Sequence, residues 1–205
     1  MGSDRQFSEV ANGIGFHDAL PVVRASQPCV QIVEAADAAA RRRRLRDFAA
    51  YLLGRTAGDV VIHHAPGQRP RVVAPLGSGL VLSSASRGDV AVFGAASSPI
   101  GVDVEAVGEA AAIPWLVLHP GERAALEAAP DPACAFARLW SLKEAYLKAI
   151  GSGLNRDPAQ FEVRPGAQQV EIVDPGERRT IIAAATVWRT QAGTRYAVSA
   201  VLLPA

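Results

Sequence analysis

A short apolar segment that carries two carboxylates, Ile100 to Glu105, constrains the fold of this chain more than any other part of the sequence. Its branched residues alternate with small or charged ones, which is typical of a β-strand. Successive side chains of a strand point to opposite faces, so Asp103 and Glu105 are expected side by side on one face. Two like charges held this close need a compensating partner. The strand expected at 90–95 and the turn at 97–99 precede this segment and predict a β-hairpin.

Helical and extended segments occur in both parts of the chain. Apolar residues at helical spacing predict helices at 35–54, 120–128 and 132–151. Branched residues between turns predict further strands at 28–33, 60–63, 72–76, 79–83, 161–163, 170–173, 180–188 and 196–203. We therefore expect an α+β fold, built as two similar α+β halves in one chain. The expected domains are residues 1–105 and 106–205, with the active site in the cleft between them.

Composition restricts the class of protein. The chain has 205 residues, of which 49% are hydrophobic and 20% charged, so it can bury a sizeable core. Its net charge of +1 indicates no nucleic-acid partner. No run approaches the ~20 apolar residues that a membrane helix needs, so we expect no membrane partner. Cys29 and Cys134 lie far apart without metal-type spacing, and the N-terminus lacks a signal-peptide pattern, which together predict a cytoplasmic protein with free thiols.

A second informative stretch is LWSLKEAYLKAIGSGL, residues 139–154. On a helix, Glu144 and Lys148 are four residues apart and share a face. Taken alone, this is an ordinary surface pair worth about 0.2–0.5 kcal/mol. Together with Asp103 and Glu105, however, Glu144 makes a set of three carboxylates of the kind that binds Mg²⁺. A lysine one turn later would neutralise phosphate oxygens, so the combination predicts a phosphoryl-transfer site.

The two motifs together, PIGVDVE followed by WSLKEAYLK, resemble those of the 4′-phosphopantetheinyl transferases. The chain length is similar to that of the larger, Sfp-like branch of this family, a monomeric pseudo-dimer of two α+β halves. The resemblance implies transfer of the 4′-phosphopantetheine arm of coenzyme A to a serine of an apo acyl or peptidyl carrier protein. Adenosine 3′,5′-bisphosphate would leave, with Mg²⁺ as cofactor. The carrier and its pathway, whether fatty acid, polyketide or nonribosomal peptide, stay open.

The resemblance also implies roles for the motif residues. Asp103, Glu105 and Glu144 would hold Mg²⁺ against the pyrophosphate of coenzyme A. Either Glu144 or Glu105 would take the proton from the carrier serine. Lys148 would balance charge on the pyrophosphate, and Lys143 beside it is a weaker candidate for the same cluster.

Further contacts to coenzyme A follow from weaker similarities. The turn GQRP at 67–70 makes Arg69 a coenzyme A contact. In the arginine run at 41–46, which is either a solvated helix face or an anion-binding surface, Arg46 fits the arginine that binds the 3′-phosphate, and Arg43 or Arg44 could reach the same anion. The sequence departs from the family where Ser-His-Ser is usual. Residues 84–86 are Ser84, Ala85 and Ser86, so the two serines are the remaining candidates for phosphate contacts.

Several alternatives remain open at this level. Arg87 could substitute for the missing histidine or be an exposed loop arginine. His119 precedes a proline and is expected to start a helix. Residues 115–118 are a candidate carrier-docking surface, although burial is the expected fate of Trp115. Two other functions compete with transfer, namely a catalytically impaired module that binds coenzyme A and carrier protein, and an unrelated Mg²⁺ phosphohydrolase.

Overall fold

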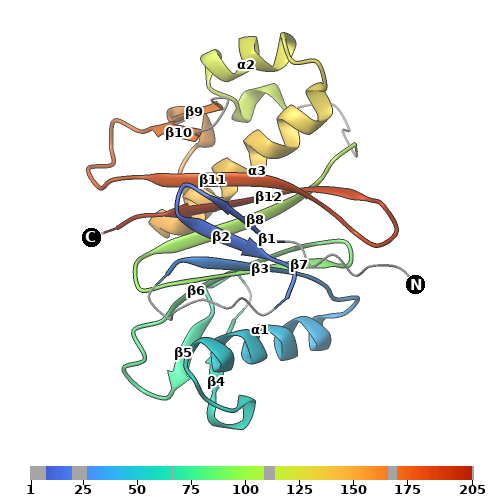
Figure 1. The fold of residues 1–205 in the computed structure, drawn as a ribbon. Helices are drawn as coiled ribbons and strands as arrows, with labels where there is room; N and C mark the ends of the chain where they lie inside the picture. The colour runs from blue at the N-terminus through green and yellow to red at the C-terminus, as the bar shows by residue number, and fades with distance from the viewer. Residues whose placement is uncertain (1–7, 20–26, 66, 109–113, 166–169, 205) are drawn as a thin grey trace.

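Two β-sheets face each other in the computed structural model, which describes residues 8–19, 27–65, 67–108, 114–165 and 170–204 (Figure 1). The first sheet has the strand order β1-β2-β3-β7-β6-β5-β4, and the second has the order β8-β12-β11-β10-β9. Neighbouring strands are antiparallel except for the parallel pair β2 and β3. The strands are β1 (Ser8–Ala11), β2 (Ile14–His17), β3 (Cys29–Glu34), β4 (Val61–His63), β5 (Arg71–Ala74), β6 (Val81–Arg87), β7 (Val90–Ala96), β8 (Ile100–Ala106), β9 (Glu162–Pro165), β10 (Val170–Val173), β11 (Ile182–Arg189) and β12 (Arg195–Leu202).

Helices cover the outer face of each sheet. The helix α1 (Ala38–Leu52) packs on the first sheet, and α2 (Pro120–Glu127) and α3 (Pro132–Ile150) lie on the outer side of the second. Four short 3₁₀ helices connect the larger elements, namely η1 (Ala57–Asp59), η2 (Trp115–Val117), η3 (Gly153–Asn155) and η4 (Pro158–Gln160). Three apolar clusters result, one between the sheets and one under each helical layer. No helix in the described part of the chain is long and apolar enough to cross a bilayer.

The two sheets repeat one strand order. In the first, β3 is followed by a helix and then by β4 to β7, which assemble as β3-β7-β6-β5-β4. In the second, β8 is followed by helices and then by β9 to β12, which assemble as β8-β12-β11-β10-β9. The predicted α+β fold with two similar halves is thus confirmed. The domain boundary at residues 105 and 106 stays a prediction, while strand pairing places β8 in the second sheet.

The predicted hairpin between residues 90–95 and the strand of Asp103 is wrong. β7 pairs with β3 and β6, whereas β8 pairs with β12 and with no other strand of the described residues. The turn at 97–99 carries the chain from one sheet to the other, and the two strands then meet face to face. Gly94 makes this possible, because a Cβ at this position would lie 2.4 Å from Val102 Cγ1.

Candidate active site

The acid face of β8 lies directly against helix α3. Gly101 allows the close approach, because a Cβ there would lie 1.9 Å from the carbonyl oxygen of Ala145 in the helix. Val102 and Val104 point into the layer between the sheets, so Asp103 and Glu105 point the other way, toward α3. The predicted strand and the shared face of the two acids are both present.

Lys148 joins this acid face to the helix. Its Nζ lies 2.7 Å from Asp103 Oδ1 and donates to the carbonyl of Val102 at 3.2 Å. Asp103 is only 6% exposed, and its Oδ2 is buried without a hydrogen-bond partner. Burial raises the pKa of Asp103 to about 7, against the opposing effect of the Lys148 ammonium, and the charges of Glu105 and Glu144 raise that pKa further. The three acids therefore share one electrostatic environment.

The donor set suits a hard divalent cation, although the acids have other partners in the structure. Among the described residues, no group of three His, Cys, Asp or Glu side chains is arranged as a metal site. Asp103 pairs with Lys148, and Glu105 Oε2 lies 3.5 Å from Arg87 Nε. The unpartnered Oδ2 of Asp103 and the purely oxygen donor set nevertheless fit Mg²⁺. Arg87 therefore forms an ion pair with Glu105, one of the predicted Mg²⁺ ligands.

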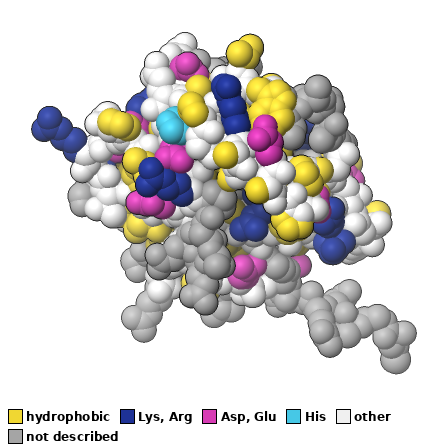
Figure 2. Space-filling view, turned by 90° about the horizontal axis from the view of Figure 1, so that it is seen from above, with side chains coloured by type: hydrophobic (Ala, Val, Ile, Leu, Met, Phe, Trp, Pro, Cys, Tyr) yellow, Lys and Arg dark blue, Asp and Glu magenta, His cyan; other side chains and the backbone are white. Residues whose placement is uncertain are grey.

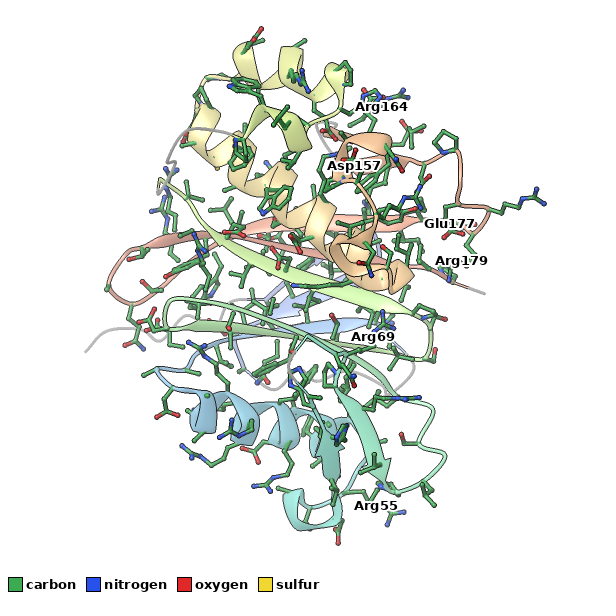
Figure 3. The ribbon with its side chains drawn as sticks, turned by 180° about the vertical axis from the view of Figure 1, so that it is seen from behind. Arg55, Arg69, Asp157, Arg164, Glu177 and Arg179 are labelled. Atoms are coloured by element: carbon green, nitrogen blue, oxygen red, sulfur yellow. The ribbon has the colours of Figure 1, made fainter. Side chains whose placement is uncertain are left out.

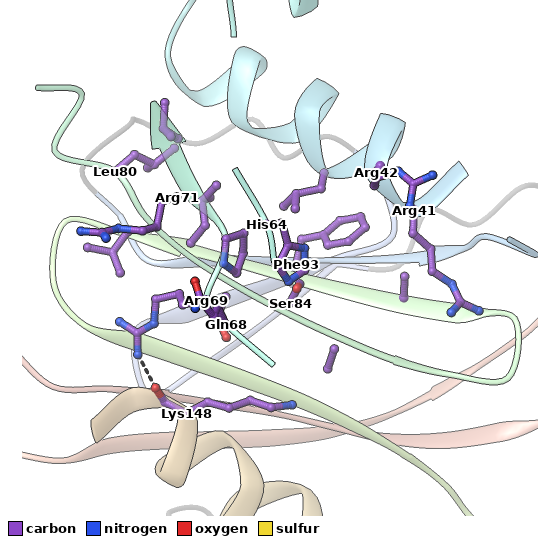
Figure 4. Close-up of a pocket in the computed structure, with 18 of the residues that line it drawn as sticks. Arg41, Arg42, His64, Gln68, Arg69, Arg71, Leu80, Ser84, Phe93 and Lys148 are labelled. Atoms are coloured by element: carbon purple, nitrogen blue, oxygen red, sulfur yellow. Dashed lines mark hydrogen bonds between the residues drawn. The ribbon is translucent and has the colours of Figure 1, made fainter. Parts of the chain in front are cut away.

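A cavity of about 1260 Å³ opens beside Lys148 (Figure 4). Its walls come from α1, from the segment β4 to β6, and from Lys148, Gly151 and Gly153 at the end of α3. Its lining is rich in basic side chains, namely Arg41, Arg42, His64, Arg69, Arg71 and Lys148. Both halves therefore contribute to one space whose charge suits a polyanion.

The predicted coenzyme A contacts are distributed unevenly around this cavity. Ser84, Ser86 and Arg69 line it, whereas Arg46 lines a neighbouring cavity of about 410 Å³ that shares Arg42, Leu45 and His64 with the first. Ser86 Oγ accepts a hydrogen bond of 3.1 Å from Arg41, an arginine that our sequence reasoning did not single out. His64 and Arg71 also line the cavity and were not predicted, whereas Arg42 belongs to the arginine run for which an anion-binding surface was one alternative.

Arg69 connects the first half to the end of helix α3 (Figures 3 and 4). Its guanidinium donates to the carbonyl of Lys148, and to that of Ala149 at 3.3 Å. The last carbonyls of a helix carry partial negative charge, so this is a favourable place for a cation. Burial lowers the pKa of Arg69. The residue thus holds the main chain at Lys148 as well as lining the cavity.

Lys143 does not belong to the acid cluster, in contrast to our expectation. It is fully buried, and its Nζ donates to the carbonyls of Pro158 at 2.7 Å and Phe161 at 2.9 Å and lies 2.8 Å from Glu122 Oε1. An ammonium has three hydrogens, so these three contacts satisfy it completely. The sequence already distinguishes these two positions, because Lys143 and Lys148 are the only lysines among its 21 lysine and arginine residues.

The remaining expectations concern the region around α2. His119 is the N-cap of that helix, as predicted, and its Nδ1 accepts from the Gly121 backbone N–H at 3.3 Å. The expected burial of Trp115 is wrong, because it is 41% exposed and its neighbour Leu116 is 88% exposed. Since η2 is a single turn, it cannot bury all its side chains at once. Figure 2, which views this end of the molecule, shows hydrophobic side chains next to charged ones of both signs.

Residues 99–201, about half of the chain, match the family model for the 4′-phosphopantetheinyl transferase superfamily. The chain belongs to this superfamily. The match covers β8, α3 and β12, which carry the acid face and Lys148. The family that the motifs indicated is therefore confirmed, and its larger, Sfp-like branch stays a prediction.

Two solved structures of this superfamily are similar to part of the chain. The holo-[acyl-carrier-protein] synthase (AcpS) of Thermotoga maritima has a TM-score of 0.40 and 21% identity, over 52% of this chain and 62% of that chain. A holo-(acyl-carrier-protein) synthase from Bacillus anthracis str. Ames in complex with CoA (3′,5′-ADP) has a TM-score of 0.39 and 21% identity, over 52% of this chain and 95% of that chain. The similarity thus spans less than two thirds of the Thermotoga chain. No curated protein matches the sequence.

Proposed function

We propose that this chain transfers the 4′-phosphopantetheine arm of coenzyme A to a serine of an apo carrier protein and releases adenosine 3′,5′-bisphosphate. The observation that carries the proposal is the position of Lys148. It contacts Asp103 on the acid face and also lines the basic cavity, so it joins a candidate metal site to a candidate nucleotide site. A polyanion in the cavity would place its phosphates beside the acids.

The cavity supports a nucleotide substrate by its size and charge. Ligand sites commonly have volumes of roughly 300–1,000 Å³, and this one reaches about 1260 Å³. Arg41 and Arg42 on α1 and Arg71 on β5 supply positive charge around it. We assign coenzyme A to this cavity, with its pyrophosphate next to Lys148.

Asp103, Glu105 and Glu144 would hold Mg²⁺, which neutralises phosphate charge and polarises the attacked phosphorus when it is bound. The carrier serine Oγ forms a bond to the phosphorus that bears the pantetheine arm, and the bond from this phosphorus to the bridging oxygen breaks. The serine proton passes to Glu144 or Glu105, and the electron pair leaves with adenosine 3′,5′-bisphosphate. The ammonium of Lys148 stabilises the negative charge on the pyrophosphate.

The partner of this reaction is an apo acyl or peptidyl carrier protein. We propose η2 as part of its docking surface, because Trp115 and Leu116 are exposed there. The two halves of this one chain both contribute residues to the cavity, which supports the assignment to the Sfp-like branch and a monomeric state. Size-exclusion chromatography with light scattering tests the oligomeric state.

The test of the reaction is mass spectrometry of apo carrier proteins incubated with the full chain, coenzyme A and Mg²⁺, with EDTA as the control. We expect a metal-dependent gain of one phosphopantetheine arm on the carrier serine. Asp103→Asn should abolish the gain, whereas Glu171→Gln, at an exposed acid of β10, should leave it unchanged. Coenzyme A binding without any gain on any carrier would instead favour the impaired binding module. Metal-dependent cleavage of small phosphate esters would favour the phosphohydrolase.

A further inference from the structure

Lys148 has one ammonium group and two neighbouring sites that can hold it. In the structure this group lies 2.7 Å from Asp103 Oδ1, while the side chain also lines the cavity and is 31% exposed. Figure 4 shows the side chain extended along the cavity floor. A short movement of the side chain would bring the ammonium from the acid face to the cavity.

The surroundings allow the side chain of Lys148 to move while its main chain stays fixed. The carbonyl of Lys148 accepts hydrogen bonds from Arg69 and, at 3.2 Å, from the backbone N–H of Gly151. The side chain has four flexible methylenes and a compact charge, unlike the planar fork of arginine. This chain uses arginine at all basic positions except 143 and 148, and Lys143 is fixed by three contacts. Lys148 has two contacts and is partly exposed, so its side chain is the less constrained of the two.

In the structure, Asp103 already has one cationic partner. This partner is the ammonium of Lys148, and the side chain of Asp103 is only 9% exposed. Glu105 and Glu144 act electrostatically on Asp103, and Glu105 itself forms an ion pair with Arg87. A divalent cation bound to Asp103 would lie a few ångströms from the ammonium in a poorly solvated place, where like charges repel strongly.

We propose that Lys148 and the divalent cation compete for Asp103, and that a polyanion in the cavity relieves the competition by drawing the ammonium to its phosphates. This inference rests on the proposed function, which places the cation at the acids and coenzyme A in the cavity. Lys148 thereby disfavours metal binding to the protein without coenzyme A and favours binding of the two together. Because coupling between sites is reciprocal, the metal should increase affinity for coenzyme A by the same factor.

The test is Mn²⁺ binding to the full chain, measured by electron paramagnetic resonance with and without coenzyme A. Without coenzyme A, Lys148→Met should bind Mn²⁺ at least about tenfold tighter than the unmodified protein, within the usual range of coupling between sites. With coenzyme A the difference should shrink to less than about threefold, because the ammonium has then left Asp103. Without coenzyme A, Arg71→Met removes a charge from the same cavity without touching Asp103, and should change Mn²⁺ affinity by less than about twofold.

Equal Mn²⁺ affinities of the unmodified protein and Lys148→Met would overturn the inference, as would equal gains in Lys148→Met and Arg71→Met. If no variant binds Mn²⁺, the inference and the metal assignment in the proposed function both fail. If the competition is found but no carrier is modified, only the proposed function fails.

A second measurement needs no variant. Acetylation of amines by a reagent such as sulfo-N-hydroxysuccinimide acetate, followed by peptide mass spectrometry, reports the state of each lysine. Mn²⁺ should accelerate the acetylation of Lys148, and coenzyme A should then protect it. Lys143 is fully buried and serves as the internal control, which should stay unmodified throughout. An acetylation rate of Lys148 that does not change with Mn²⁺ would contradict the competition.

Discussion

Removal of either partner of the buried pair of Glu122 and Lys143 should destabilise this fold more than most single substitutions do. Glu122 Oε2 accepts from the N–H of His119 at 2.8 Å, and Oε1 accepts from the N–H of Val163 at 2.7 Å and from Lys143 at 2.8 Å. The pair therefore joins α2, α3 and β9. Both side chains are completely excluded from water.

Removal of one partner leaves the other charge buried without compensation, which costs about 3–5 kcal/mol. Glu122→Gln should be near the upper end, because the ammonium then has only neutral acceptors. Lys143→Met should be near the lower end, because two backbone N–H groups still bind the carboxylate. For a chain of this size, each kcal/mol lowers Tm by about 2–4 °C. The single variants should therefore melt roughly 6–20 °C lower.

Urea unfolding followed by circular dichroism measures these free energies of unfolding. The double variant Glu122→Gln/Lys143→Met leaves no buried charge at this site, and its loss should be smaller than the sum of the two single losses by about 1–3 kcal/mol. Arg195→Met, which breaks an ion pair whose side chains are 36% and 49% exposed, is the matched control and should cost less than about 1 kcal/mol. Single losses below about 1 kcal/mol, or strict additivity in the double variant, would refute the reasoning.

Three other expectations follow from the structure. Hydrogen bonds from Arg179 lower the pKa of Glu177 to about 2. This carboxylate therefore contributes stability above pH 4.5 that is lost as the pH falls toward 2. A carboxyl NMR titration should show this pKa, and Arg179→Met should return it toward 4.5. Burial raises the pKa of the Cys29 thiol to about 12. A thiol reagent should therefore modify only Cys134 in the native protein and both cysteines in denaturant. Fast reaction of Cys29 in the native protein would contradict its burial. Gly101→Ala inserts a methyl into the backbone of α3 and should lower Tm by more than about 5 °C and weaken metal binding; unchanged melting would show that β8 and α3 are not in tight contact.

Local periodicity was sufficient to predict the acid face and the helix opposite it. Asp103 and Glu105 share a face because they are two residues apart on a strand, and Glu144 and Lys148 share one because they are four apart on a helix. These relations depend only on secondary structure. The contact between Lys148 and Asp103 confirms that the two elements meet.

Helical geometry also explains why two of the predicted basic residues, Lys143 and Arg46, lie apart from the large cavity and the acid face. Lys143 and Lys148 are five residues apart, which at 3.6 residues per turn is a rotation of about 140° beyond one full turn. They cannot both face the acids, and Lys143 is buried beside Glu122 instead. The same spacing separates Arg41, which lines the large cavity, from Arg46, which lines the smaller one.

Other features depended on contacts between distant parts of the chain. The partner of β8 is β12, almost a hundred residues later, and no local pattern distinguishes it from β7. By contrast, the hairpin of β1 and β2 had a local signal that we missed. Asn12 and Gly13 have φ angles of 48° and 75°, which suits the Asn-Gly turns that favour two-residue hairpins.

The repeated strand order implies that the chain contains two copies of one structural unit, and that the two copies have different functions. Gln31 occupies the outward-facing middle position of β3, and Asp103 occupies the corresponding position of β8. Both are buried and each has one oxygen without a partner, but only the second is an acid. One copy thus keeps the charged face. The other copy supplies most of the cavity wall, so substitutions within residues 38–86 should change ligand binding in the cavity, whereas substitutions on the acid face should change metal binding.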